Sequence, residues 1–269
     1  MGELVELAQR FELTGHLVAL VLVLARVTPL VVLLPFLGGS SLSPAVRTVV
    51  ALAVAAVVFP AASPGPLDDL PGGFVLVLML KEALVGTCLG LLGAVAFHTL
   101  AMAGQLVDQA RGVASASVTD PATGEEMSPL ASFHLQLAVA IFLLMGGHRA
   151  FLAAVAGSYE TIPLGELPIS DAGTRDAALL LARLVGGAIA TALMLAGPAI
   201  SAIVLTDLDL GLLGRTAPQI GTYFMAMPLR AAIGLAMALL SLSVVFDELA
   251  GFLGQAVAVV QGATRLLGP

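Results

Sequence analysis

The sequence predicts an all-α, polytopic membrane protein of about six long hydrophobic helices. Of its 269 residues, 59% are hydrophobic and only 11% are charged, and the mean hydropathy is +1.04. Soluble domains carry about 25% charged residues, so this chain has too little polar material to cover a water-soluble globule of its size. The charged residues also gather at the borders of long apolar runs, which indicates membrane spans rather than soluble domains.

Six apolar stretches approach the length that a membrane-spanning helix needs. The hydrocarbon core is about 30 Å thick and a helix rises about 1.5 Å per residue, so about 20 apolar residues suffice. Because backbone amides in lipid must be satisfied within their own segment, each stretch is predicted to be helical. In chain order, the stretches are residues 17–37, 45–62, 74–107, 130–156, 177–205 and 223–246.

The segments between these stretches carry the residues that form turns and loops. Each is rich in proline, glycine, aspartate or serine, which favour turn conformations. In chain order they are GGSSLSP (38–44), PAASPGPLDDLPGG (60–73), SVTDPATGEEMSP (117–129), IPLGELPISDAG (162–173) and TDLDLGLLGRTAPQIG (206–221). No soluble domain would fold in connections this short, so the apolar helices are expected to make up the whole fold.

Charge and motif content exclude several classes of function. The net charge of -7 opposes binding to a phosphate backbone, so nucleic acid is not an expected partner. Cys88 is the single cysteine, which rules out an intramolecular disulfide and thiolate zinc sites. The four histidines show no metal-ligand spacing, and no GxSxG elbow or glycine-rich phosphate loop occurs. We therefore expect no enzyme, no metal and no cofactor.

A few charged residues lie inside or beside the predicted spans. Placing a charged side chain at bilayer depth costs at least about 2.5 kcal/mol of free energy, so each one needs an oppositely charged or hydrogen-bonding partner or contact with water. Arg26, close to Pro29, lies mid-segment and is expected at a buried subunit contact or a water-filled path. For Lys81 and Glu82, pairing near a helix entrance and a Glu82 side chain facing the protein interior both stay open. Arg183 is a further candidate.

Small residues give one helix a nearly smooth face. Glu82, Gly86 and Gly90 recur at intervals of four, and Gly93 follows. Residues four apart lie on the same side of a helix, and small side chains there let another backbone approach closely. This pattern predicts helix packing rather than chemistry.

Residues 108–129, DQARGVASASVTDPATGEEMSP, form the most unusual segment. It is rich in small and hydroxyl residues between two long hydrophobic helices, and its Asp120-Pro121 pair and Gly124 favour turns. A surface loop is one interpretation. Irregular backbone is also tolerated at membrane depth where it is buried in protein or lines a cavity. The segment is therefore a candidate pore-lining or plugging element.

Two stretches of the chain contain short motifs at fixed spacings. Residues 111–165 contain DPATG, FLLMGGH and PLG, and residues 205–230 contain an acidic-LG, RTAPQ and an MP turn. These motifs resemble those of the type III secretion export-gate family that contains flagellar FliR and injectisome SctT, whose pattern includes DP-x-x-G, F-x-x-x-GGH and P-x-G. Arg26 with Pro29, Pro44 with Arg47, and Glu82 with Gly86 and Gly90 fit as well. The resemblance covers about residues 17–250. It departs from the family at Ile220-Gly221, where an asparagine is usual, and at Arg230, where a lysine is usual.

The resemblance implies a protein-export subunit that spans the bacterial inner membrane several times, with its helices arranged as hairpins. It implies N-terminal helices over about 1–172, including a plug loop at 111–127, and a C-terminal helical hairpin over about 173–269. One copy would assemble with two smaller export-gate membrane subunits and meet the large export-gate and switch proteins of the same system. Unfolded secreted proteins would pass through the resulting entrance pore, energised by the proton motive force and an associated ATPase.

The resemblance also suggests roles for individual residues. For the pore plug or gate, it implies Arg111, Gly112, Ala114, Ser115, Ser117, Asp120, Pro121, Gly124 and Met127. For subunit contact or packing, it implies Arg26, Pro29, Arg47, Glu82, Gly86, Gly90, Arg215, Pro218 and Gln219.

Two other functions compete with protein export. A small-solute transporter often shows internal repeats and broken helices around a midplane site, and the two halves of this chain show no clear repeat. An intramembrane enzyme would need a nucleophile or a metal set, which the motifs do not provide. The residues alone favour a transport or channel role, and the family resemblance shifts this towards protein export.

Overall fold

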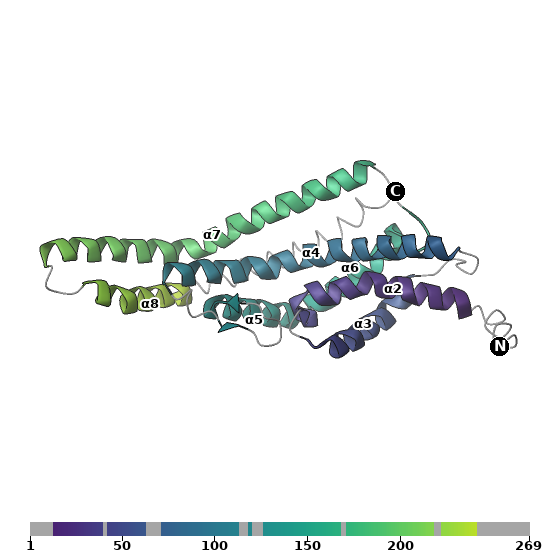
Figure 1. Cartoon of the computed structure of the whole chain (residues 1–269), viewed down its shortest axis with the longest axis horizontal. Coiled ribbons are helices and arrows are strands. Elements are labelled where there is room, and N and C mark those ends of the chain that lie inside the picture. Colours follow the sequence, from purple (N-terminus) through teal and green to yellow (C-terminus); the bar gives the residue numbers. More distant parts are fainter. Residues whose placement is uncertain are drawn as a thin grey trace. The chain divides into compact units, whose positions relative to one another are not determined.

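The computed structural model describes residues 13–39, 42–62, 71–112, 118–119, 126–167, 171–217 and 222–240. These residues are almost entirely helical, which confirms the all-α prediction (Figure 1). The helices are α2 (Leu13–Leu33), α3 (Pro44–Val58), α4 (Gly72–Ala110), α5 (Pro129–Leu144), α6 (Gly147–Thr161), α7 (Asp171–Thr216) and α8 (Thr222–Leu240). Short 3-10 turns, η1 (Pro35–Leu37) and η3 (Phe59–Ala62), follow α2 and α3, and two strands, β1 (Val118–Thr119) and β2 (Glu126–Met127), pair antiparallel.

Local sequence signals set several helix starts. Pro44 and Pro129 occupy the first helical turns of α3 and α5, where the missing N–H would have no intrahelical partner in any case. Ser43 and Ser128 precede them as N-cap residues, and the Ser128 hydroxyl accepts a hydrogen bond from the Ala131 amide. These starts lie within one residue of the predicted ones.

The fourth predicted stretch, 130–156, is two helices rather than one. α5 and α6 are bent by 76° at the break between Leu144 and Gly147. Gly146 has a φ of 75°, a left-handed conformation that ends one helix and caps the next. The prediction of one continuous helix was wrong because a glycine pair inside an apolar run interrupts the helix without lowering its hydropathy.

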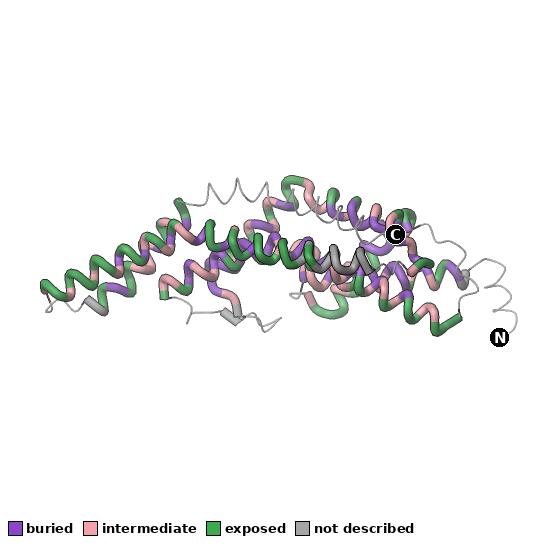
Figure 2. The backbone as a smooth tube through the Cα atoms, turned by 90° about the horizontal axis from the view of Figure 1, so that it is seen from above, coloured by how far each residue is buried: buried purple, intermediate pink, exposed green. Residues whose placement is uncertain are grey.

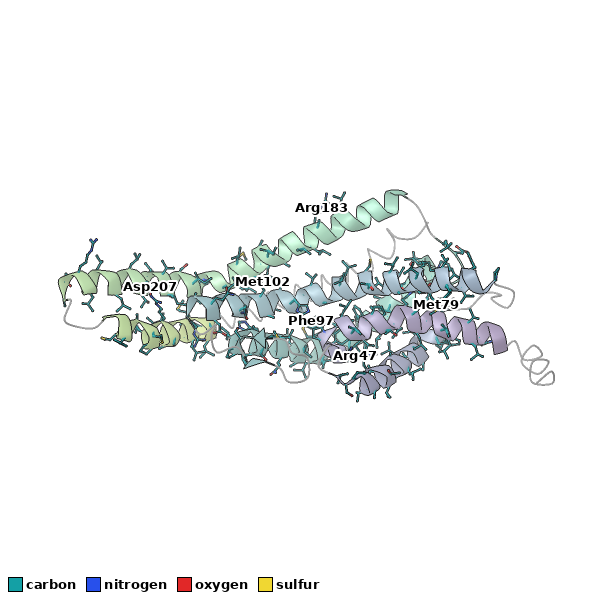
Figure 3. The ribbon with its side chains drawn as sticks, in the orientation of Figure 1. Arg47, Met79, Phe97, Met102, Arg183 and Asp207 are labelled. Atoms are coloured by element: carbon teal, nitrogen blue, oxygen red, sulfur yellow. The ribbon has the colours of Figure 1, made fainter. Side chains whose placement is uncertain are left out.

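The fifth stretch continues well beyond its predicted end. Residues 206–216, predicted as part of a loop, form the last three turns of α7. Thr206 donates its hydroxyl proton to the Ala202 carbonyl, and Asp207 forms an ion pair with Arg230 of α8 (Asp207 is labelled in Figure 3). The leucines of this part continue the apolar composition, which outweighs the low helix propensity of the aspartates and Gly211.

The chain divides into two compact units, each made of separate parts of the sequence. The first contains the described parts of Met1–Ala94 and Gly146–Arg183, and the second contains those of Val95–Met145 and Leu184–Gly254. Helices α4 and α7 contribute residues to both units. In the first unit, α3 lies beside α2 (Figure 1), and Phe36 and Phe151 pack edge-to-face with ring centroids 5.5 Å apart.

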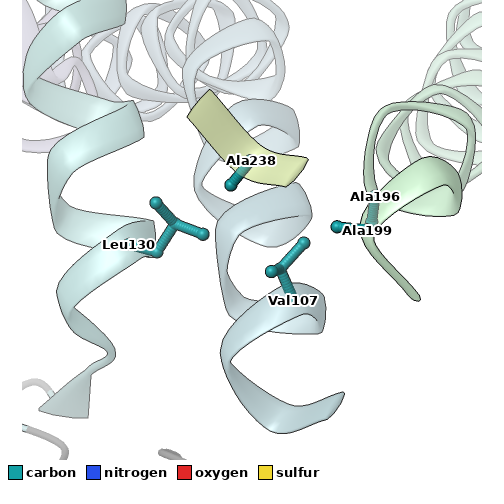
Figure 4. Close-up of a cluster of buried hydrophobic side chains, with 5 residues drawn as sticks. All are labelled: Val107, Leu130, Ala196, Ala199 and Ala238. Atoms are coloured by element: carbon teal, nitrogen blue, oxygen red, sulfur yellow. The ribbon is translucent and has the colours of Figure 1, made fainter. Parts of the chain in front are cut away.

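The core of the second unit brings together four helices (Figure 4). Val107 of α4, Leu130 of α5, Ala196 and Ala199 of α7, and Ala238 of α8 are all buried in one cluster. The three alanines let α7 and α8 approach the larger valine and leucine closely. Elsewhere in this unit, Phe97 and Phe142 of α4 and α5 pack edge-to-face with centroids 5.2 Å apart.

Four of the described helices are long and apolar enough to cross a membrane, and the bent pair α5–α6 makes a fifth if it counts as one span. They are Gly15–Leu33, Pro44–Ala62, Gly72–Ala110 and Ala182–Thr216. With 39 and 46 residues, α4 and α7 measure about 58 and 69 Å at 1.5 Å per residue, roughly twice the hydrocarbon thickness. Large apolar side chains are exposed on each of the four long helices, which fits a multi-pass membrane protein. Figure 2 marks the exposed residues in green along the backbone.

Candidate functional site

A buried ion-pair network centres on Arg26 of α2, in the first unit. The Arg26 Nε donates to the Glu82 carboxylate of α4, and both side chains are fully buried. Nη1 donates to the Ser158 hydroxyl at 2.8 Å, and Nη2 donates to the Ile162 carbonyl at 2.9 Å. The guanidinium carbon lies 3.9 Å from the centre of the Tyr159 ring. Arg26 therefore joins α2 to α4 and to the C-terminal end of α6.

Lys81 extends this network to the turn after α6. Its ammonium lies 2.7 Å from Glu82 Oε1 and donates to three backbone carbonyls, those of Pro163 at 2.7 Å, Leu164 at 3.2 Å and Glu166 at 2.9 Å. The last carbonyls of a helix and the turn beyond it have no intrahelical donors. Lys81 supplies those donors, so it fixes the turn that follows α6 against α4.

The network holds α2, α4 and the end of α6 together. Burying a charge is costly unless it is paired and hydrogen-bonded. Here Glu82 pairs with both Arg26 and Lys81, and each of these two cations also donates to groups of the α6 region. Arg26 and Glu82 are used inside the chain, so their side chains are not exposed to a partner. The Lys81 pairing and the inward-facing Glu82, left open by the sequence, occur together.

The small-residue face of α4 packs directly on the backbone of α2. A Cβ atom added to Gly86 would overlap the carbonyl oxygen of Arg26 and lie 2.8 Å from its carbonyl carbon. One added to Gly90 would lie 2.9 Å from Cδ1 of Leu33 and 3.5 Å from the Pro29 carbonyl oxygen. Gly86 thus permits the close approach that brings Arg26 and Glu82 together.

A second cluster surrounds Asp108, in the second unit, at the end of α4. Asp108 is fully buried. Its Oδ1 accepts from Arg111 Nη1 at 2.6 Å and its Oδ2 accepts from the Leu130 amide at 2.8 Å. Arg111 Nε donates to the Ala231 carbonyl of α8 at 3.2 Å. A single carboxylate therefore holds the two ends of the segment between Arg111 and Leu130.

One more turn of α4 supports the start of α5. The Gln105 side-chain oxygen accepts from the Ser128 amide at 3.2 Å. A Cβ atom added to Gly104 would lie 2.6 Å from the Leu130 carbonyl oxygen, so the first turn of α5 rests on the α4 backbone. Close to it, Met127 is half-buried and pairs with Val118 in the two-residue strands.

The remaining candidate residues are distributed as follows. Arg47 is half-buried, and its Nη2 donates to the Leu42 carbonyl at 3.2 Å (Arg47 is labelled in Figure 3). Gly112, with a φ of 76°, follows α4, while Arg183 and Arg215 are exposed on α7. The other candidates lie outside the described residues; they are Ala114, Ser115, Ser117, Asp120, Pro121, Gly124, Pro218 and Gln219. Among the residues that the structure describes, no group of three or more His, Cys, Asp or Glu side chains could hold a metal.

Sequence reasoning missed several residues of the two clusters. Asp108 carried a local signal, because it lies three residues before Arg111 on one helix, a spacing that favours an ion pair. Ser128 also carried one, as a serine before a proline at a helix start. Ser158 and Tyr159 carried none, because their roles depend on a segment far away in the chain.

Most of the chain is similar to proteins of a single family. The sequence model of the family described as bacterial export proteins, family 1, matches residues 17–256. The chain is 26% identical to the flagellar biosynthetic protein FliR of Bacillus subtilis (strain 168), over 93% of this chain and 96% of that protein. It is 31% identical to the surface presentation of antigens protein SpaR of Salmonella typhimurium, over 87% and 86%. It is 28% identical to the Yop proteins translocation protein T of Yersinia pestis, over 79% and 81%.

Proposed function

The chain belongs to family 1 of the bacterial export proteins and is a component of a type III export apparatus; on that premise we propose that it is a pore-forming subunit of the export gate. It lies in the bacterial inner membrane and forms, with two smaller membrane subunits, the entrance pore for unfolded substrate proteins. The observation that carries this proposal is the family match over residues 17–256, which includes all six predicted helices.

The exposed apolar surface supports assembly with other subunits. Only 33% of an 18-residue apolar stretch within Ala182–Thr216 is buried within the chain, and side chains such as Met194, Leu208 and Leu212 are 60 to 67% exposed. Because α7 is roughly twice as long as the hydrocarbon core is thick, part of this surface needs a cover other than lipid. Neighbouring subunits of an export gate would supply that cover. The large export-gate and switch proteins of the same system are proposed as further neighbours.

The C-terminal part fits the helical hairpin that the family resemblance implies. The Asp207–Arg230 ion pair joins α7 to α8, and the alanine contacts of the second unit hold the same two helices together. We propose that about 173–269 form this hairpin and that about 1–172 supply the other helices and the plug. In this proposal, Arg215 at the exposed end of α7 contacts a neighbouring subunit, together with Pro218 and Gln219.

Native mass spectrometry tests the assembly. The tagged chain is co-expressed with its two smaller export-gate neighbours and purified in mild detergent. We expect one stable complex that contains a single copy of this chain. A lone monomer or homodimer under the same conditions would contradict the proposal and would favour the alternative function, a small-solute transporter.

Substitutions at Gly112 test the plug assignment of residues 111–127. We expect Gly112→Val to raise the ion conductance of the purified gate complex in planar bilayers and to reduce secretion. A β-branched side chain is strained at a φ of 76°, by about 1 to 3 kcal/mol. Ser115→Trp should act in the same direction through bulk.

Gly112→Asn is the matched control for backbone strain. Asparagine tolerates the left-handed region far better than valine, so this variant should stay close to the unsubstituted complex. If Gly112→Val and Ser115→Trp both left conductance and secretion unchanged, the plug assignment would be wrong.

A further inference from the structure

The carboxylate of Asp108 connects two segments that are separated in the sequence. One of its oxygens faces Arg111, just after α4, and the other faces the amide of Leu130, in the first turn of α5. Asp108 is fully buried, so it depends on these partners for the hydrogen bonds that water would otherwise provide. Losing Arg111 would leave a buried carboxylate without its countercharge, which would also weaken its hold on α5.

Arg111 also contacts α8 directly. Its Nε donates to the Ala231 carbonyl, and its aliphatic stem lies across Gly234, one turn further along α8. A Cβ atom added to Gly234 would overlap Cγ of Arg111 and lie 2.7 Å from Cδ. The absence of a side chain at residue 234 is therefore what lets Arg111 reach both Ala231 and Asp108.

We propose that Asp108 and Arg111 form a latch that couples the position of α8 to both ends of the segment between Arg111 and Leu130. When α8 is in place, Arg111 is held by Ala231 and Asp108 together, and Asp108 holds Leu130. When α8 moves, Arg111 loses the Ala231 carbonyl, its pairing with Asp108 weakens, and the start of α5 is released. The inference rests on the proposed function, in which that segment gates the pore.

The latch has a geometric basis in the two kinds of donor on one side chain. A guanidinium presents Nε and Nη donors in a rigid fork, so Arg111 can face Ala231 and Asp108 at the same time. A lysine has one ammonium on a flexible stem and cannot reproduce both contacts. When the latch is closed, two further contacts hold the start of α5 on α4. Gln105 accepts from the Ser128 amide, and Gly104 lets the Leu130 backbone lie close to α4.

The test measures how fast a cysteine at the α5 end of the segment reacts with a water-soluble maleimide. The probe is Met127→Cys, a half-buried position, in a Cys88→Ala background and in the assembled gate complex. Arg111→Ala and Gly234→Ala should each raise the labelling rate about tenfold, which is what losing one hydrogen bond to a charged group amounts to. Gly197→Ala of α7, where an added Cβ meets nothing within 4 Å, is the matched control and should change nothing.

The double variant carries the decisive comparison. If Gly234 acts through Arg111, adding Gly234→Ala to Arg111→Ala should produce no further increase in labelling. Arg111→Lys, which keeps the charge near Asp108, should lose the response to Gly234→Ala. Independent, additive effects of the two substitutions, or unchanged labelling in both single variants, would overturn the latch.

Conductance separates this inference from the proposed gating function. If Arg111→Ala and Gly234→Ala raise labelling but not conductance, the latch stands and the gating role of the segment falls. If Gly112→Val raises conductance while neither latch variant changes labelling, the gating role stands and the latch falls.

Discussion

Replacing Glu82 with alanine should destabilise the protein so strongly that most of the molecules fail to fold stably. Arg26 would keep its full burial but lose its carboxylate partner, and Lys81 would lose the same group. Breaking a buried ion pair by removing one partner costs about 3 to 5 kcal/mol, a large share of the roughly 5 to 15 kcal/mol that stabilises a typical protein. We expect a sharply lower yield of purified chain and a lower melting temperature of the gate complex in detergent.

Two further variants show whether the loss comes from the unpaired charge. Glu160→Ala removes an acidic group from an exposed position of α6 and should leave yield and melting temperature unchanged. The double variant Arg26→Met with Glu82→Leu removes both buried charges and should recover much of the stability, because an apolar pair of similar volume is often no less stable. Equal defects in Glu82→Ala and the double variant would show that the unpaired Arg26 charge is not the cause.

Replacing Gly86 with alanine should separate α2 from α4. The added methyl group would overlap the Arg26 carbonyl, which belongs to a helix backbone and cannot rotate away. Inserting a methyl group into a well-packed core costs about 1 to 3 kcal/mol and more where backbone must move. The expected result is a clear drop in the melting temperature of the complex, with a larger drop for Gly86→Leu.

A graded series tests the reason for this effect. Gly90→Ala meets the Cδ1 end of the flexible Leu33 side chain, so it should cost less than Gly86→Ala. Gly157→Ala on α6 meets nothing within 4 Å and should be neutral, or stabilising by up to about 1 kcal/mol through helix propensity. Three indistinguishable melting temperatures would contradict the close approach of α2 and α4 at Gly86.

The class of protein and most of the helices could be predicted because they depend on local composition. Within the described residues, five of the six predicted apolar runs correspond to one long helix each, and Pro44 and Pro129 mark helix starts. The errors occurred where local composition is a poor guide. Gly146 interrupts a run that stays apolar throughout, and residues 206–216 stay helical although they contain aspartates and glycine.

The candidate sites could be predicted only in part. The spacing of Glu82, Gly86 and Gly90 predicted a packing face on one helix, but not that the backbone of α2 lies on it. Arg26 was predicted to need a partner or water, yet several acidic residues were available along the chain. The pairing with Glu82, 56 residues away, becomes visible only in the folded chain.

By itself, the sequence determined that this chain is a multi-pass helical membrane protein of the export family, because hydropathy, turn residues and family motifs are properties of neighbouring residues. Only the tertiary structure decided which buried charges meet. The Lys81 ammonium reaches carbonyls more than 80 residues away, and Asp108 holds Leu130 across 22 residues. Such contacts depend on how the helices pack in three dimensions. A missing Cβ atom or a bend between two helices determines which of several chemically equivalent residues comes within hydrogen-bonding distance.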